Sequence, residues 1–217
     1  MCSETRPADR ALATDGGTDV PSSAAGSEDT VILVVDDDED LAVTISLWLQ
    51  EEYTVEMAHN GEEALDAYGP HIDVVLLDRR MPTMSGDETL TRLRERGATV
   101  PVAMMTAVDP ELDIADLPLD MYLRKPVRRD PVVEAVASLV DRNCYDEPTR
   151  QAFAIGSKFE ILGENYSEEE LAADSRTRGL ADEFVRLQDE TAIVVESDET
   201  STELATTRTV AETIREH

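Results

Sequence analysis

The sequence contains few aromatic residues, only two cysteines and no long apolar run. Aromatic residues make up 4% of the 217 positions, so aliphatic side chains and methionine must fill any core. Cys2 and Cys144 are too few and too far apart for a disulfide framework or a cysteine metal site. No stretch reaches the roughly eighteen apolar residues of a membrane span, and the N-terminal region lacks a signal-peptide pattern. We therefore expect a protein of the reducing cytoplasm that does not enter a membrane.

Positive charge is also scarce. The chain has 48 acidic and 19 basic side chains, a formal net charge of −29, and its only lysines are Lys125 and Lys158. Self-repulsion of this size destabilises a compact protein in dilute salt and is screened in concentrated salt. This balance predicts a halophilic cytoplasm, with an acidic mesophilic protein as the alternative. Non-specific nucleic-acid binding is not expected, because affinity for phosphate backbones comes from clustered Lys and Arg.

The pattern of apolar residues predicts an α/β domain. Residues 1–29 are rich in Ser, Thr, Gly, Asp and Pro without periodicity, which predicts a disordered N-terminal segment. After them, short apolar runs alternate with segments of helical spacing. The apolar runs cover residues 31–35, 53–57, 73–77, 100–105 and 121–123, and the helical segments cover residues 40–51, 62–68, 87–96, 110–117 and 130–142. Strict alternation predicts a doubly wound, five-stranded parallel sheet.

A different pattern follows residue 145. Apolar positions at helical spacing predict a small α-helical segment over residues 145–190, with two helices. The second helix has a capping-box pattern, in which Ser167 is followed three residues later by Glu170. Residues 191–195 fit another strand or a helix end, and residues 191–217 as a whole are predicted to form a flexible tail.

Polar side chains follow four of the predicted strands. They are Asp36, Asp37 and Asp38 after the first strand, Asp78 after the third, Thr106 after the fourth and Lys125 after the fifth. The carboxyl ends of parallel strands meet at one edge of the sheet, where doubly wound proteins bind ligands. Carboxylates there would suit Mg²⁺, and a bound metal would let Asp78 act as a nucleophile toward a phosphoryl group. Lys125 and Thr106 would bind the other phosphoryl oxygens, so the pattern predicts an acyl-phosphate acceptor site.

These motifs resemble the response regulator receiver family. The similarity covers roughly residues 30–142 and rests on VVDDDED, LLDRRMPTMSG, MMTA and YLRKP, in this order. It implies a flavodoxin-like strand order 2-1-3-4-5 in a receiver domain over residues 30–144. It also implies a two-component phosphorelay, in which a histidine kinase transfers a phosphoryl group to the chain.

The resemblance assigns roles to single residues. Asp78 corresponds to the phosphoacceptor and Asp37 to a direct Mg²⁺ ligand, while Asp36 would hold metal-bound water and the backbone carbonyl of Arg80 would complete the set. Lys125 corresponds to the family lysine, with a cis bond to Pro126. Thr106 and Tyr122 correspond to the switch hydroxyl and the switch aromatic. Arg79 and Arg80 after the acceptor, and Leu119 with Asp120 where a Gly-Ala pair is common, depart from the family pattern.

The C-terminal region has a resemblance of its own. Residues 145–190, together with DRRMP and TAVDP, resemble regulators of halophilic archaea that end in a helical module called HalX. This resemblance does not say what the module does.

Simpler interpretations remain for each motif. Residues 36–38 could form a solvated turn or a helix cap, Asp78 could begin a turn, and Thr106 could cap a helix. Tyr122 could be an aromatic residue packed at the sheet edge, and Trp48 is expected to pack the first helix on the sheet.

Three functions compete at this stage. A signalling switch that acts through protein contacts, including a possible homodimer, is favoured over a metabolic enzyme. An aspartyl-phosphate phosphatase of the haloacid dehalogenase type would use Asp36 and Asp38, although Asp40 stands where that motif has Thr or Val. A transcriptional regulator could use the C-terminal helices, but residues 145–190 carry twelve acidic and five basic side chains, so direct DNA binding is disfavoured.

Overall fold

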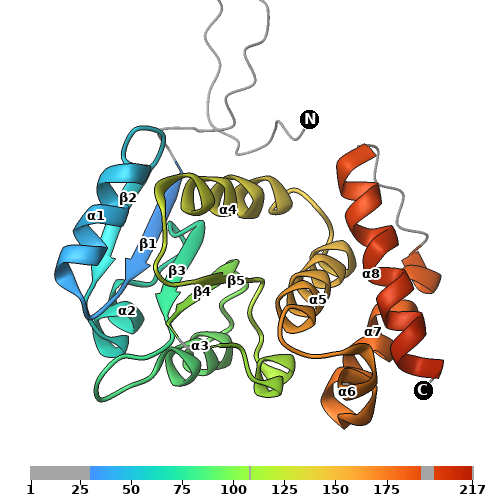
Figure 1. Cartoon of the computed structure of the whole chain (residues 1–217). Coiled ribbons are helices and arrows are strands. Elements are labelled where there is room, and N and C mark those ends of the chain that lie inside the picture. Colours follow the sequence, from blue (N-terminus) through green and yellow to red (C-terminus); the bar gives the residue numbers. More distant parts are fainter. Residues whose placement is uncertain (1–29, 108, 192–197, 217) are drawn as a thin grey trace, which may run out of the picture.

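The structure, a computed structural model, describes residues 30–107, 109–191 and 198–216 (Figure 1). The predicted disorder of residues 1–29 lies outside this range, as do residues 192–195 of the segment predicted as a strand or helix end. Within the range, no helix combines the length and the apolar character that a bilayer crossing requires.

A five-stranded parallel sheet forms the centre of the first part of the chain. Its strands are β1 (Val31–Val35), β2 (Thr54–Ala58), β3 (Val74–Asp78), β4 (Val102–Thr106) and β5 (Met121–Arg124), in the order β2-β1-β3-β4-β5. Strands β3 and β4 are buried at every position, which explains their unbroken apolar runs. The predicted fold and strand order are confirmed.

Helices cover both faces of the sheet. On one face, α1 (Glu39–Leu49) and α4 (Arg129–Arg142) share an apolar cluster with β1 and β3. On the other face lie α2 (Gly61–Ala67) and α3 (Gly86–Glu95). Trp48 packs partly buried against the cluster under α1, as predicted.

The connection between β4 and β5 holds only a short 3₁₀ helix, η1 (Leu112–Asp116), in place of a full α-helix. This matches the short helical pattern predicted over residues 110–117. Ile114 and Ala115 of η1 are buried, and Pro118 follows within two residues of its end. This short helix leaves part of the sheet near β5 for another element to cover.

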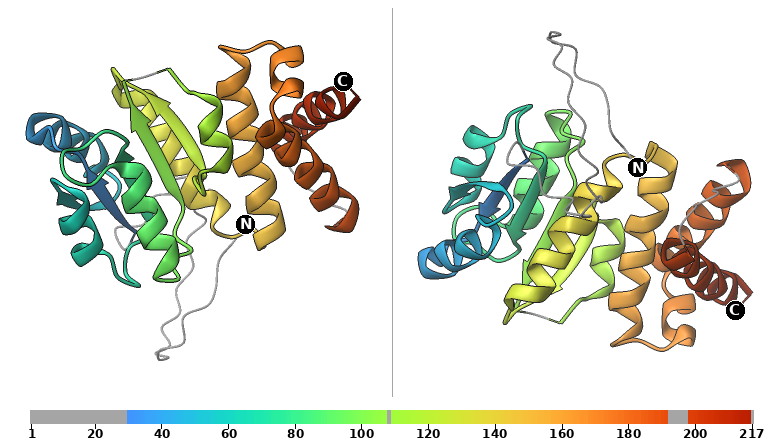
Figure 2. Two further views of the ribbon diagram at one scale, coloured as in Figure 1. Left: turned by 90° about the horizontal axis from the view of Figure 1, so that it is seen from below. Right: turned by 90° about the horizontal axis from the view of Figure 1, so that it is seen from above.

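After α4, the described residues form four more helices: α5 (Glu147–Gly163), α6 (Glu168–Ala173), α7 (Ser175–Thr191) and α8 (Asp198–Glu216). Helix α5 contacts β5 and η1, and α7 also contacts η1. Figure 2 shows from two sides that this group of helices lies beside the β5 edge of the sheet. The predicted capping box is present, because Ser167 and Glu170 each accept a hydrogen bond from the other's backbone N–H.

Two expectations for this region were wrong. Residues 198–216 form α8 and not a flexible tail, and the helices number more than the two predicted for the C-terminal region. The buried side chains Leu204, Thr207, Ala211 and Ile214 recur every three or four residues, which makes a helical stripe. In the sequence, threonines and glutamates surround these positions, so the helical pattern is hard to recognise. Gly156 of α5 lies opposite Thr207, where an added Cβ would sit 2.9 Å from the threonine Oγ1, so the two helices approach closely.

Candidate functional site

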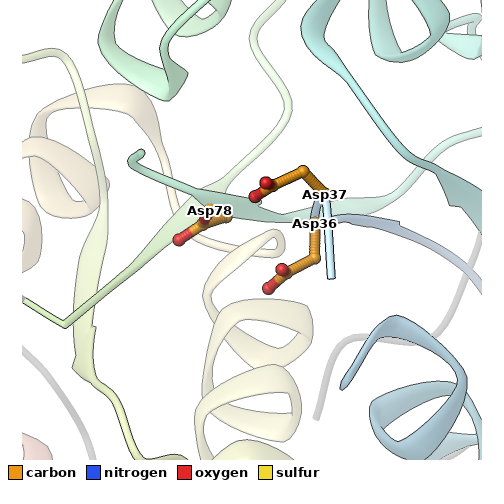
Figure 3. A group of neighbouring side chains, drawn as sticks. All are labelled: Asp36, Asp37 and Asp78. Carbon is orange, nitrogen blue, oxygen red and sulfur yellow. The ribbon is translucent and has the colours of Figure 1, made fainter. Parts of the chain in front are cut away.

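Three carboxylates meet at the carboxyl ends of β1 and β3. Asp36 and Asp37 follow β1 directly, Asp78 is the last residue of β3, and these two strands are neighbours in the sheet. Each residue offers a carboxylate oxygen, and these oxygens all lie within 4.8 Å of one another (Figure 3). Asp36 and Asp78 are buried, whereas Asp37 is exposed. The site is therefore anchored in the sheet and reachable from solvent at Asp37.

Lys125 connects two of these carboxylates. Its Nζ lies 2.7 Å from Asp36 Oδ2 and 2.9 Å from Asp78 Oδ1. The backbone N–H of Lys125 donates to the carbonyl of Thr106 at 2.7 Å, and the peptide bond to Pro126 is cis, as predicted. The structure thus brings Lys125 from the fifth strand to the acidic residues of the first and third.

The charges of the site influence one another strongly. Burial raises the pKa of Asp78, hydrogen bonding and attraction from Lys125 lower it, and repulsion from Asp36 and Asp37 raises it, with a net increase. Burial lowers the pKa of Lys125, but its bonds to Asp36 and Asp78 outweigh burial and raise it. Three carboxylates face one ammonium group, so the pocket has an excess of negative charge that a cation would neutralise.

Asp38 has a different position from its two neighbours. Its carboxylate accepts a hydrogen bond from the Leu41 N–H at 3.1 Å and so caps the start of α1. Its own N–H donates to Asp36 Oδ1 at 3.1 Å. The helix-cap interpretation therefore holds for Asp38, while Asp36 and Asp37 face the pocket.

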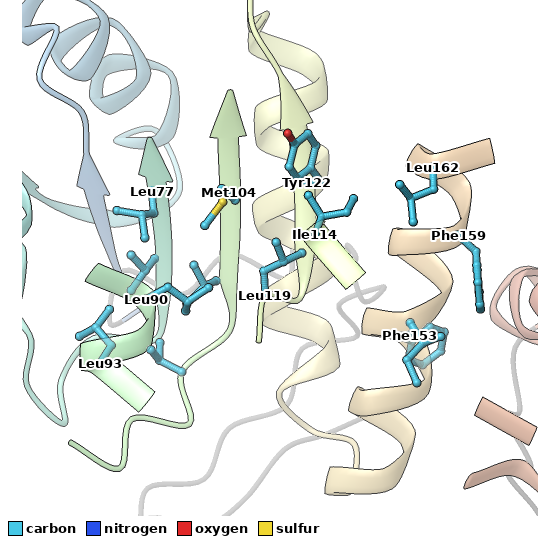
Figure 4. Packing of buried hydrophobic residues seen from close by; sticks show 14 of the residues in the cluster. Leu77, Leu90, Leu93, Met104, Ile114, Leu119, Tyr122, Phe153, Phe159 and Leu162 are labelled. Atoms are coloured by element: carbon cyan, nitrogen blue, oxygen red, sulfur yellow. The ribbon is translucent and has the colours of Figure 1, made fainter. Parts of the chain in front are cut away.

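Thr106 and Tyr122 lie on the two strands beyond Asp78. Thr106 ends β4 and is buried, one position past the residue that pairs with Asp78 in the sheet. Tyr122 is buried on the edge strand β5, in the cluster that also contains Ile114 and Leu119 (Figure 4). Its predicted packing at the sheet edge is confirmed, and its role in switching stays a prediction.

Comparison with known proteins agrees with this geometry. The family model described as "Response regulator receiver domain" matches residues 32–137. The chain contains a response regulator receiver domain.

Two relatives and one solved structure illustrate the similarity. A putative transcriptional regulator of Haloferax volcanii is 47% identical over 168 residues, which is 75% of this chain and 28% of that protein. The transcriptional regulatory protein CpxR of Escherichia coli K12 is 39% identical over 120 residues, covering 54% of this chain and 51% of CpxR. A two-component response regulator structure from Clostridium difficile has a TM-score of 0.50 at 24% identity, covers 54% of this chain and 99% of that chain, and supports the fold alone. The chain thus spans about a quarter to a half of the length of these relatives.

The acidic group of the receiver domain suits a hard divalent cation. Three carboxylates at this spacing supply oxygen ligands of the kind that Mg²⁺ prefers, and the exposed Asp37 keeps the group open to solvent. Arg80, the fourth predicted contributor, is exposed, and the role of its carbonyl stays a prediction.

Arg79 is a feature of the receiver domain that the sequence did not reveal. Although it follows Asp78 directly, it is buried, and its guanidinium binds both carboxylate oxygens of Asp87 on α3. It also pairs with Asp113 of η1 at 2.5 Å. Burial alone would lower the pKa of Arg79, but these carboxylates raise it well above its usual range. The only signal in the sequence was the departure from the family pattern at this position.

Asp120 explains the second departure from the family pattern. Its carboxylate accepts from the Val102 N–H at 2.8 Å and from Arg94 Nη2 at 3.1 Å. Burial raises the pKa of Asp120, and the nearby Arg94 opposes that increase. This residue ties the start of β5 to β4 and α3 at the end of the sheet opposite to Asp78.

Proposed function

We propose that this chain is a response regulator in which Asp78 accepts a phosphoryl group from a histidine kinase. The observation that carries the proposal is the bridge of Lys125 between Asp36 and Asp78, beside Asp37, within a receiver domain. We further propose a receiver unit over residues 30–144 and a HalX-like helical unit that begins at residue 145. The role is signalling and not metabolic catalysis.

The residues of the pocket suit phosphoryl transfer. An Asp78 carboxylate oxygen forms a bond to phosphorus while the P–N bond of the kinase phosphohistidine breaks, and the imidazole nitrogen keeps the electron pair and takes a proton from water. Asp36, Asp37, Asp78 and the Arg80 carbonyl would hold Mg²⁺, which would supply charge neutralisation for the approaching phosphoryl oxygens. Lys125 stays charged and offers its N–H groups to those oxygens.

The switch residues would then respond to the new charge. Thr106 would turn its hydroxyl toward a phosphoryl oxygen, and Tyr122 would change its side-chain position with it. Both are buried, so their rearrangement would be transmitted to the residues packed around them.

Intact-mass measurement after acetyl phosphate treatment tests the acceptor. With Mg²⁺ and molar KCl we expect one added phosphate on the wild type and none on Asp78→Asn. Asp66→Asn, which alters an exposed carboxylate on α2, is the matched control and should be labelled like the wild type. A label that persists in Asp78→Asn, or that maps to Asp36 as in a phosphatase, would refute the proposal.

A transcriptional output is the second candidate, because the relatives from H. volcanii and E. coli are named as transcriptional regulators. The H. volcanii match covers 75% of the 217 residues, or about 163 residues of this chain. The receiver match ends at residue 137, so a match of that length must continue beyond the receiver domain. The similarity therefore extends into the C-terminal helices. Residues 145–190 nonetheless carry seven more acidic than basic side chains, twelve against five. We therefore propose that these helices act through protein contacts or homodimerisation, and DNA binding at molar KCl would contradict this.

A further inference from the structure

A hollow lies at the end of the sheet opposite to Asp78. Its volume is about 590 Å³, within the range of roughly 300–1,000 Å³ that small-molecule sites occupy. It is lined by residues that precede β3 and β4, by Asn143 after α4 and by Arg150 of α5. The hollow therefore lies between the receiver domain and the first of the C-terminal helices.

Hydrogen bonds hold the backbone on both sides of the hollow. On the side before β4, Arg94 Nη1 donates to the carbonyl of Ala98 at 3.1 Å and to that of Val100 at 2.7 Å. On the side before β3, Asn143 Nδ2 donates to the carbonyl of Asp73 at 3.2 Å. The hollow is therefore formed before any ligand binds, as is usual for small-molecule sites.

The charge of the hollow is opposite to that of the chain. Among the described residues that line it, Arg96 and Arg150 are basic and Asp73 alone is acidic. The Asp73 carboxylate already accepts a hydrogen bond from the Val31 N–H at 2.9 Å. Because the chain has 48 acidic and only 19 basic side chains, a pocket in which arginines outnumber carboxylates is unusual for it. The hollow should therefore attract an anion.

Both arginines have hydrogen bond donors left to offer. Arg96 Nη1 donates to the carbonyl of Leu65 at 2.6 Å, and its other guanidinium N–H groups have no partner among the described residues. Arg150 pairs with Glu147 through Nη2, while its Nε is enclosed without a hydrogen bond partner in the described part of the chain. The nearby Asp120 carboxylate is bonded to other groups. An enclosed donor without an acceptor costs free energy, and an anion with several oxygens would remove that cost.

The rest of the lining offers apolar surface, from Tyr68, Pro70, Ile72, Val100 and Pro101. We propose that the hollow binds a small organic phosphate that carries a ring, of the size of a nucleoside monophosphate. Guanidinium groups bind phosphate oxygens through parallel N–H bonds, so Arg96 and Arg150 hold the phosphate. The apolar side chains pack against the ring. This site is separate from Asp78, and the proposal does not depend on phosphorylation there.

Calorimetric titration of the full-length protein tests the site. In Mg²⁺-free molar KCl we expect saturable binding of at least one of AMP, GMP, CMP and UMP, and binding about tenfold weaker or less for its nucleoside and for inorganic phosphate. Arg96→Gln and Arg150→Gln should each weaken the binding of that nucleotide by about tenfold. Arg92→Gln removes an exposed arginine of α3 outside the hollow, and it should bind like the wild type, as should Asp78→Asn.

Each contrary result would overturn the proposal. None of the four nucleotides would bind at millimolar concentration, or the nucleoside would bind as tightly as its monophosphate. Equal binding by the wild type and both glutamine variants would place the ligand elsewhere, and loss of binding in Asp78→Asn would place it in the acidic pocket. Thermal unfolding checks the fold of each variant. Arg96→Gln decides alone if Arg150→Gln is unfolded, because Arg96 is exposed.

Discussion

At the scale of single residues, Asp78 is held in a crowded acidic environment. Its pKa is raised because it is buried and lies near Asp36 and Asp37, in spite of Lys125. The ionised carboxylate therefore lowers the stability of the fold when no cation is bound. We expect Asp78→Asn to unfold at a higher temperature than the wild type in Mg²⁺-free KCl.

With Mg²⁺ bound, the wild type should unfold at a higher temperature than Asp78→Asn. A ligand that binds only the folded state raises its stability with concentration, and the wild type has the complete carboxylate set. Thermal unfolding over a Mg²⁺ titration at constant KCl should show a larger increase for the wild type than for Asp78→Asn. Equal increases for both proteins would contradict the assignment of Asp78 as a ligand.

Lys158 should make stability depend on pH. Burial lowers its pKa from 10.5 to about 8, while Asp120 and Asp116 oppose that change. The folded protein then loses the proton before the unfolded chain does, so the unfolded state binds more protons between about pH 8 and 10.5. The free energy of unfolding should therefore rise with pH in this window, by at most about 1.4 kcal/mol per pH unit.

Urea unfolding of the wild type and of Lys158→Met measures this slope. Other groups titrate in the same range, so the difference between the two proteins is the informative quantity. A wild type that loses stability relative to Lys158→Met as the pH rises would show that the ammonium is not disfavoured by burial.

At the residue level, the sequence predicted that the groups at the strand ends lie close together, while their roles stay predictions. Asp36, Asp37, Asp78 and Lys125 follow apolar runs, and parallel strands place such positions at one edge. The contacts of Arg79 with Asp113, and of Lys158 with the end of η1, were not predictable. They join residues 34 and at least 41 positions apart through long side chains, and no local pattern marks such pairs.

At the scale of elements, alanine substitutions at two glycines should show how closely the C-terminal helices pack. Gly156 of α5 faces Thr207 of α8, whereas an added Cβ at Gly179 of α7 would meet nothing within 4 Å. Alanine in a helix interior is favoured over glycine by about 0.5–1 kcal/mol. Gly179→Ala should therefore stabilise the protein by that amount, and Gly156→Ala should destabilise it.

Chemical denaturation of both variants tests the packing of α5 on α8. Adding Thr207→Ala to Gly156→Ala should restore part of the loss, since it removes the atom that the new methyl group meets. If Gly156→Ala were as stable as Gly179→Ala, the close approach of the two helices would be refuted.

The strands were predicted more accurately than the C-terminal helices. Buried parallel strands carry continuous β-branched runs, and such runs are visible without knowledge of the fold. Helix α8 is held by small buried groups such as Ala211 and Thr207, whose burial depends on α5 and α7 being in place. Such a helix is stabilised by tertiary contacts and not by its own sequence pattern. Its composition alone therefore suggested a flexible tail.

At the scale of the whole molecule, a net charge of −29 should make stability depend on salt. The range of charge repulsion falls from about 10 Å at 0.1 M salt to about 3 Å at 1 M. We expect the urea midpoint to rise steadily with KCl up to molar concentrations. Sucrose at matched water activity is the control, because it does not screen charge, and an equal rise in sucrose would rule out screening as the cause.

The apolar cluster that runs from the sheet into α5, α7 and α8 also bears on how such proteins recombine. A domain boundary at residue 144 would suggest two domains that can be exchanged independently. A chimera cut there would pair a foreign receiver with helices shaped for Ile114, Leu119 and Tyr122. Exchange of segments between paralogues should therefore give a folded protein only where η1 and α5 are taken from the same parent.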